Sequence, residues 1–103
     1  TGVTFFRVKA NLNNKTPEHI MGEWHTDFRD KKTMKDMQTA ILYINTNNGY
    51  TAFKNGDKVE SVANRMVMFD CSTEHAAVTC TDEDRRVVVT FNFKLSTPVK
   101  RGS

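Results

Sequence analysis

The sequence predicts an all-β domain, and three observations support this fold class. Apolar and polar residues alternate with a period of two along most of the chain, the pattern of strands with one buried face. Turn signals rich in Asn, Gly and Asp separate these stretches. No stretch has the apolar spacing of a convincing amphipathic helix. A series of short antiparallel strands favours a jelly roll, the double-stranded β-helix that includes the cupin-like metal-binding barrels.

Local sequence justifies each expected strand in turn. Eight strands are expected, at 4–12, 20–28, 39–45 and 50–53, within 54–62, and at 65–70, 75–80 and 85–93. A loop containing Pro17 precedes the second strand, and the turn signal TNNG closes the third. The pair Asn55-Gly56 predicts a type I′ hairpin between the fourth and fifth strands. The acidic turn TDED joins the last two.

The first strand alternates most cleanly. One face is expected to carry Phe6, Val8, Ala10 and Leu12, and the other Phe5, Arg7, Lys9 and Asn11. If the polar face lines a cavity, Arg7 and Lys9 could contact a substrate, but they could equally be solvated surface charges. The sequence leaves both interpretations open.

Length, charge and cysteine content bound the remaining possibilities. The 103 residues should form one domain, a core over 1–95 followed by a tail over 96–103. The charged stretch 29–38 is expected to be a connection, either a short helix or a mobile lid. The net charge of +3 permits an anionic partner without requiring one. Cys71 and Cys80 alone do not make a disulfide framework, so a reducing cytoplasm is predicted. No membrane partner is expected, because no apolar run approaches the length of a membrane span.

A candidate metal site begins in the stretch GEWHTDF, residues 22–28. On a strand, His25 and Asp27 would point to the same face, so the imidazole and the carboxylate would converge. Taken alone, such a pair is more often a structural hydrogen-bonded contact than a ligand set. His75, at the start of a later strand, completes two histidines and one carboxylate, the facial triad of non-haem Fe(II) oxygenases. His19 is expected to be a loop residue.

Four stretches give the chain a resemblance to a known family. WHTD, AILYINTNNGYTAF, NRMVMFDCSTEH and RRVVVTFNF resemble the catalytic core of the Fe(II)- and 2-oxoglutarate-dependent dioxygenases. Within that superfamily the chain looks most like the prolyl-4-hydroxylase-like branch, especially its small phage-type members, for which the host cytoplasm is the expected location. The resemblance covers residues from about 5 to 93, and the motifs are specific in combination.

The resemblance implies a ligand set and a cosubstrate site. The metal ligands for Fe(II) would be His25, Asp27 and His75. An arginine of the last strand would bind the distal carboxylate of 2-oxoglutarate, because its planar fork pairs two oxygens at once. Arg86 is favoured over Arg85, since it shares a face with Thr90 and Asn92 and the family's pocket-lining threonine follows its arginine by four residues. Further candidates for cosubstrate contact are Tyr43, Thr90 and Asn92.

Two features depart from the family pattern. The family often carries an aromatic residue and a proline near the end of the first strand, where this chain has Asn13-Asn14, so one pocket contact is in doubt. Members of the family usually carry N-terminal helices outside the larger sheet, and this chain offers none. If Tyr43 and Arg86 point inward, an apolar outer face would consist of Phe6, Val8, Leu42, Ile44, Val87, Val89, Phe91 and Phe93. We expect a second copy or a missing segment to cover that face.

The resemblance implies an oxygenase that couples oxidative decarboxylation of 2-oxoglutarate to succinate with hydroxylation of a substrate. A protein or peptide side chain, with proline as one candidate, is the leading expectation, and a small-molecule substrate is also open. A nucleic-acid base oxygenase ranks lower, because that branch usually carries a second arginine six residues beyond the first, where this chain has Phe91 or Asn92. A non-catalytic jelly-roll interaction module is the third alternative.

Overall fold

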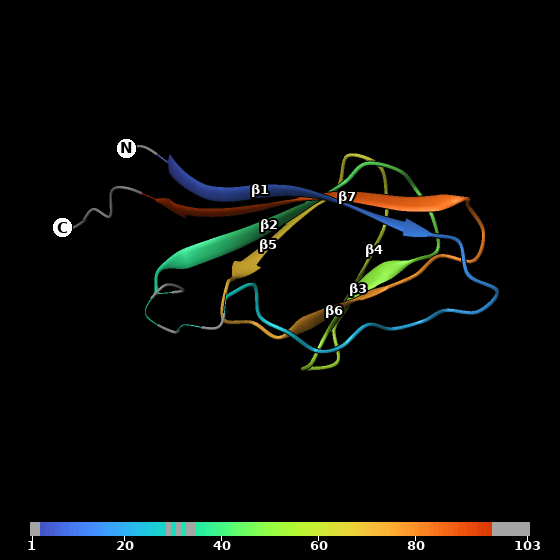
Figure 1. Ribbon diagram of the computed structural model, residues 1–103, viewed down its shortest axis with the longest axis horizontal. Helices are drawn as coiled ribbons and strands as arrows, with labels where there is room; N and C mark the ends of the chain where they lie inside the picture. The colour runs from blue at the N-terminus through green and yellow to red at the C-terminus, as the bar shows by residue number, and fades with distance from the viewer. Residues whose placement is uncertain (1–2, 29, 31, 33–34, 96–103) are drawn as a thin grey trace.

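The computed structural model describes residues 3–28, 30, 32 and 35–95. Strands in these residues form two antiparallel sheets that face each other (Figure 1). The strands are β1 (Val3–Asn14), β2 (Met37–Tyr43), β3 (Tyr50–Phe53), β4 (Lys58–Glu60), β5 (Met66–Asp70), β6 (His75–Val78) and β7 (Arg85–Leu95). The larger sheet has the order β1-β7-β2-β5 and the smaller β4-β3-β6. The predicted all-β jelly roll is confirmed, with β3 at the predicted bounds.

The predicted strand 20–28 is wrong as a continuous strand. This segment pairs with β6 only through isolated bridges, from Met21 to Val78 and from His25 to His75. Gly22 weakens extended pairing, and the side chains of His25 and Thr26 bond to nearby backbone carbonyls, which competes with a regular ladder. The segment nevertheless lies along the edge of the smaller sheet, where its bridge holds His25 beside β6.

A β-bulge in β1 corrects the predicted alternation of its first residues. Phe5 pairs with Phe93 and Arg7 pairs with Asn92, so Phe6 is the extra residue of the bulge. Phe5 was expected on the face of Arg7, but the bulge transfers it to the opposite face. There its ring lies 6.1 Å from that of Phe91 and 6.0 Å from that of Phe93. Beyond the bulge the predicted alternation holds.

The predicted type I′ turn at Asn55-Gly56 is also wrong. Gly56 has a φ of 105°, whereas Asn55 is not among the residues with positive φ. Phe53 donates its N–H to Asp57 and accepts from the N–H of Gly56, which closes a three-residue loop. Such loops combine a type I turn with one left-handed residue, usually glycine, and asparagine need not adopt positive φ.

The buried apolar side chains form small clusters rather than one large core. Ile41, Tyr43 and Val88 pack together between the sheets, with Val67 and Phe69 against them. Cys71 and Cys80 are buried free thiols. Among the described residues, no helix has the length and apolar character needed to cross a membrane. Four residues of the connection 29–38 and the tail 96–103 lie outside the described residues, so the predictions for them stay predictions.

Candidate functional site

A cavity of about 430 Å³ lies between the two sheets. Its lining is contributed by β1, by the segment that carries His25 and Asp27, and by the strands β2, β3, β6 and β7. The polar lining residues are Arg7, Lys9, Asn11, Asn13, His25, Thr26, Asp27, Thr51, His75, Arg86 and Thr90. The cavity therefore has a mixed lining, in which these polar residues stand beside the apolar Leu12, Ile41, Ala77 and Val88.

The three predicted metal ligands converge in this cavity. One ligand atom from each of His25, Asp27 and His75 lies within 4.8 Å of the other two. Nε2 of His75 is 3.3 Å from Oδ1 of Asp27, and the two imidazole rings are 4.5 Å apart. Two backbone hydrogen bonds between His25 and His75, each 3.0 Å long, bring the ligands from separate segments together.

Backbone carbonyls fix the orientation of both imidazoles. Nδ1 of His25 is 3.1 Å from the carbonyl oxygen of Glu23, and Nδ1 of His75 is 2.9 Å from that of Thr73. A neutral imidazole that donates from Nδ1 presents Nε2 as its free lone pair. Both rings therefore offer Nε2 to the same point, which is the usual arrangement of metal-ligating histidines.

Asp27 is held by donors on one of its two oxygens. Its Oδ2 accepts hydrogen bonds from the hydroxyl of Thr39 at 2.5 Å and from the amide of Asn92 at 2.6 Å. Burial opposes ionisation of this carboxyl, but hydrogen bonds from His75, Thr39 and Asn92 outweigh it and lower the pKa to about 2. Oδ1 stays directed toward His75, so Asp27 can act as a monodentate ligand.

Arg7 extends this network outward. Its Nε donates to Oδ1 of Asn92 at 3.0 Å, and one of its terminal nitrogens donates to the backbone oxygen of Asp27 at 3.2 Å. The first bond sets the orientation of the Asn92 amide, whose nitrogen must then face Asp27. The guanidinium also lies 4.8 Å from the ring centroid of Phe28. The side chain of Arg7 thus supports Asp27 in two ways, through Asn92, which bonds to the carboxylate, and through the backbone oxygen of Asp27.

His75 has an apolar wall as well as a charged neighbour. Phe69 meets its ring edge-on at 4.8 Å, and the ring of Phe53 lies 6.4 Å away. Burial lowers the pKa of His75, but the hydrogen bond with Asp27 raises it, and the net direction is upward. In the metal-free chain a proton can therefore sit between these two residues, at the position where a cation would bind.

Arg86 lies in the same cavity and is 2% exposed. Within the described part of the chain its guanidinium donates to neutral oxygens, at 3.2 Å to Ser61, 3.3 Å to Thr51 and 3.4 Å to Asn13. Burial lowers its pKa, and no carboxylate within the described residues forms an ion pair with it. A buried guanidinium without an acidic partner is costly, so this group fits an anionic ligand that enters from the cavity.

The other predicted cosubstrate residues divide between the cavity and its surroundings. Thr90 lines the cavity, whereas Tyr43 is fully buried and bonds through its hydroxyl to Thr51 at 2.7 Å. Asn92 lies against Asp27. Arg85 is exposed and lies outside the cavity, beside Glu83 and Asp84. His19, expected in a loop, is exposed and contacts the carbonyl of Thr79.

The donor set fits the group that the resemblance implies. Ligands at about 2.1 Å from a metal and at right angles to each other are about 3 Å apart, close to the spacing of His75 and Asp27. Two imidazoles and one carboxylate, without thiolate, suit Fe(II). Arg86, within the same cavity, suits one carboxylate of a dicarboxylic acid. The residues present therefore fit an iron ion at the ligand cluster and an anionic group at Arg86 in the same cavity.

Sequence reasoning missed several residues that support this site. Thr39 was not singled out, although it bonds to Asp27, and neither were Thr51 and Ser61, which contact Arg86. The signal that could have found Thr39 is strand alternation. Thr39 lies two positions from Ile41 and four from Tyr43, so it shares their face of β2 and points to the cavity side. Asn13, noted as a departure from the family, contacts Arg86 where an aromatic residue was expected.

Three comparisons with known proteins bear on this site. A model of the 2OG-Fe(II) oxygenase superfamily matches residues 14–94, which include all three candidate ligands and Arg86. A search of curated proteins finds no match to the chain. The crystal structure of a cupin protein from Bacteroides fragilis aligns with a TM-score of 0.65 over 99% of this chain and 74% of that one. At 13% identity this likeness shows the jelly-roll fold alone. Because the family model spans most of the chain and its ligand motif, the chain belongs to the 2OG-Fe(II) oxygenase superfamily.

Proposed function

We propose that the chain binds Fe(II) through His25, Asp27 and His75 and uses 2-oxoglutarate to hydroxylate a protein or peptide side chain. The observation that carries this proposal is Arg86, a buried cation that lines the cavity of the ligand cluster and has no acidic partner among the described residues. A dianionic keto acid provides the missing partner. One of its carboxylates can pair with Arg86 while its other end faces the metal ligands.

The chain's own residues have separable tasks in this proposal. His25, Asp27 and His75 hold the metal, and Thr39 and Asn92 keep Asp27 ionised and monodentate. Arg86 anchors the cosubstrate, and Thr51 and Ser61 orient its guanidinium. When bound, iron and 2-oxoglutarate supply oxidative decarboxylation to succinate coupled to oxygen insertion into a C–H bond. No side-chain general base is required for that chemistry.

A protein or peptide substrate, with proline as one candidate, rests on the resemblance to the prolyl-4-hydroxylase-like branch and its small phage-type members. The resemblance to the superfamily as a whole is carried by WHTD, AILYINTNNGYTAF, NRMVMFDCSTEH and RRVVVTFNF. The base-oxygenase alternative is less favoured, because the position six residues beyond Arg86 is Asn92, which bonds to Asp27 and Arg7. That side chain is committed to the metal ligand and is not directed to a substrate base.

The experiment is an anaerobic titration with Fe(II) and 2-oxoglutarate, followed through the visible charge-transfer absorption between the iron and the keto acid. Wild type should develop the band, and His25→Ala should abolish it. Arg86→Met should weaken 2-oxoglutarate binding by at least about tenfold, because a charge-assisted contact is lost. Arg85→Met is the matched control, since it removes a neighbouring positive charge outside the cavity, and it should titrate as wild type.

Each contrary outcome has a definite meaning. An equal loss of 2-oxoglutarate affinity in Arg85→Met and Arg86→Met would mean that the net positive charge of the region, and not the buried guanidinium of Arg86, attracts the cosubstrate. No band in a folded wild-type chain would overturn the proposal and move the non-catalytic jelly-roll module to first place.

A further inference from the structure

The cavity carries more positive charge than the proposed metal and cosubstrate would neutralise. Among the residues that the structure describes, three cationic side chains line it, Arg7, Lys9 and Arg86, against one carboxylate, Asp27. The ion pairs in the described part of the chain join Lys54 to Glu74 and His75 to Asp27, so none of the three cations has an acidic partner there. A divalent metal and dianionic 2-oxoglutarate cancel each other, and Asp27 offsets one cation. Two positive charges then remain in the loaded site.

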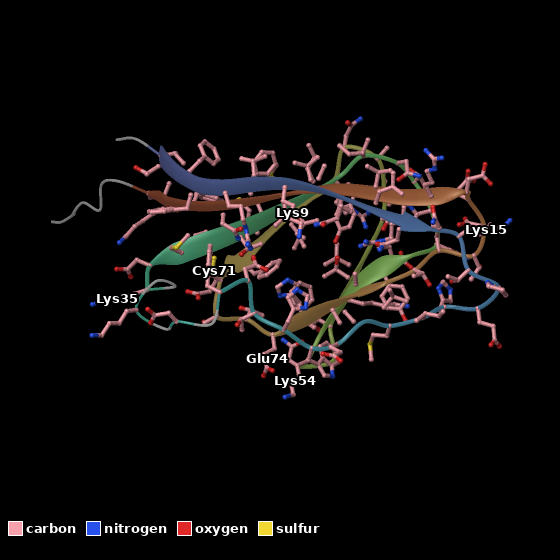
Figure 2. The ribbon with its side chains drawn as sticks, viewed as in Figure 1. Lys9, Lys15, Lys35, Lys54, Cys71 and Glu74 are labelled. Carbon is pink, nitrogen blue, oxygen red and sulfur yellow. The ribbon has the colours of Figure 1, made fainter. Side chains whose placement is uncertain are left out.

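Lys9 is the cation with no other task. Arg86 faces the cosubstrate, and the guanidinium of Arg7 is held by Asn92, by the backbone of Asp27 and by Phe28. Lys9 lies two residues from Arg7 on the same face of β1, and no hydrogen bond to its side chain occurs among the described residues. Figure 2 shows Lys9 pointing from β1 into the space between the two sheets. Its ammonium is exposed, so a ligand can reach it.

The backbone of β1 offers a second feature beside this charge. Among the described strands β1 pairs only with β7, so its other edge is unpaired. The contact from Arg7 to the backbone of Asp27 places that edge beside the segment that carries the metal ligands. An unpaired edge can align an extended peptide through backbone hydrogen bonds, whereas a nucleic acid has no such pattern to offer. The edge therefore favours a peptide as the source of the negative charge.

We propose that the substrate is an acidic peptide, which lies along the free edge of β1 and places an Asp or Glu carboxylate on Lys9. This inference rests on the proposed function and specifies its substrate class. Lys9 is then a specificity-determining residue: it selects which peptide enters and takes no part in holding the metal or the keto acid. Arg7 adds to the attraction but also positions Asp27, so Lys9 gives the cleaner test.

The test compares two pools of blocked heptapeptides that differ only in Glu or Gln at a single position. Binding to the Zn(II)-loaded chain is followed through the fluorescence of Trp24, the single tryptophan, which adjoins His25. Titrations are run with and without 2-oxoglutarate. Wild type should bind the Glu pool about tenfold more tightly than the Gln pool. Lys9→Met should remove the difference, and Lys9→Glu should reverse it in favour of a matched Lys pool.

Lys15→Glu is the charge-matched control. Figure 2 shows Lys15 at one end of the molecule, away from Lys9, and it does not line the cavity. This variant should keep the preference for the Glu pool, since long-range charge alone is screened at ordinary salt. The affinity for 2-oxoglutarate, measured by calorimetry on the same samples, should be unchanged in every Lys9 variant.

Four outcomes would overturn the inference. The first is equal binding of the two pools by wild type, and the second is loss of the preference for the Glu pool in Lys15→Glu. The third is tighter binding of a single-stranded oligonucleotide than of the Glu pool. The fourth is a Lys9→Met variant that loses affinity for 2-oxoglutarate but still discriminates between the peptide pools. Failure of the proposed function looks different: wild type then fails to bind 2-oxoglutarate at all. The titrations without 2-oxoglutarate still measure the charge preference in that case.

Discussion

The two faces of the larger sheet differ in composition. The inner face combines polar and apolar residues. The polar ones are Arg7, Lys9, Asn11, Asn13, Thr39, Arg86, Thr90 and Asn92, and Ile41, Tyr43, Val67, Phe69 and Val88 pack among them. The outer face carries Phe5, Val8, Ala10, Leu12, Ala40, Leu42, Met66, Met68, Val87, Val89, Phe91 and Phe93. An antiparallel sheet of a soluble protein usually has an apolar inner face and a polar face toward water, whereas this sheet has a mixed inner face and an apolar outer face. The cavity of the proposed chemistry lies on the inner side of this sheet, and the polar residues of the inner face line or support it.

The polar residues of the inner face and the apolar residues of the outer face are in different environments. Thr39 and Asn92 of the inner face are fully buried, and they bond to each other and to Asp27, which offsets the cost of their desolvation. Apolar groups of the outer face remain partly hydrated: Val8 and Met68 are each 57% exposed. Phe93 is 7% exposed, since Phe5 packs over it. The two faces should therefore respond to substitution in different observables, metal affinity on one and stability or association on the other.

The largest effect is expected on the inner face, at Thr39. Thr39→Val keeps the shape but removes the hydroxyl that donates to Asp27. Groups that support a ligand typically contribute about ten- to a hundredfold to metal affinity, and we expect a loss in that range. Calorimetric titration with Zn(II) measures it. Thr39→Ser retains the hydroxyl and should bind Zn(II) as wild type does. Unchanged Zn(II) affinity in Thr39→Val would mean that the hydrogen bond from Thr39 to Asp27 does not contribute to metal binding.

Arg86→Met should raise the stability of the ligand-free chain while it weakens cosubstrate binding. The substitution removes a buried charge that has no acidic partner among the described residues. We expect the free energy of unfolding in urea to rise by about 1 kcal/mol. Arg85→Met, at an exposed neighbour, should change it much less. A destabilised Arg86→Met would show that the bonds to Ser61 and Thr51 outweigh the cost of burying the guanidinium.

Phe5 and Phe6 provide a matched pair on the first strand. Phe5→Ala removes two aromatic contacts on the outer face and should cost about 1 kcal/mol in thermal or urea unfolding. Phe6 is the bulge residue and is 56% exposed, so Phe6→Ala should cost less than about 0.5 kcal/mol. Equal costs for the two would contradict the register of β1.

The smallest effect on stability is expected from polar substitutions on the exposed outer face. Val8→Thr combined with Met68→Gln should change the unfolding free energy by less than about 0.5 kcal/mol and leave metal affinity unchanged. The double variant should bind less of an apolar dye and self-associate less than wild type, because the exposed patch is smaller. A wild-type chain that is monomeric and binds no dye would remove the expectation that a second copy or a further segment covers this face.

Local pattern predicted most of the fold, because strand alternation and turn residues are local properties. It failed at segment 20–28 and at Phe6, where tertiary contacts decide between a regular ladder and isolated bridges or a bulge. Ligand candidates were readable from His25, Asp27 and His75, since their types and spacing carry the chemistry. Thr39 was not readable: it meets Asp27 only because β2 and β7 pair Thr39 with Asn92.

The position of Asp27 between the two sheets has a thermodynamic consequence. Through Thr39 and Asn92 it is bonded to the larger sheet, and through His75 it contacts the smaller one. An ion held by this residue and both histidines would cross-link residues 25–27 to residue 75, across the stretch of sequence that contains β2 to β5. It would bind the folded chain in preference to the unfolded one, in which the three ligands are not brought together. Metal binding would then be coupled to folding, and a bound ion would strengthen the contact between the two sheets.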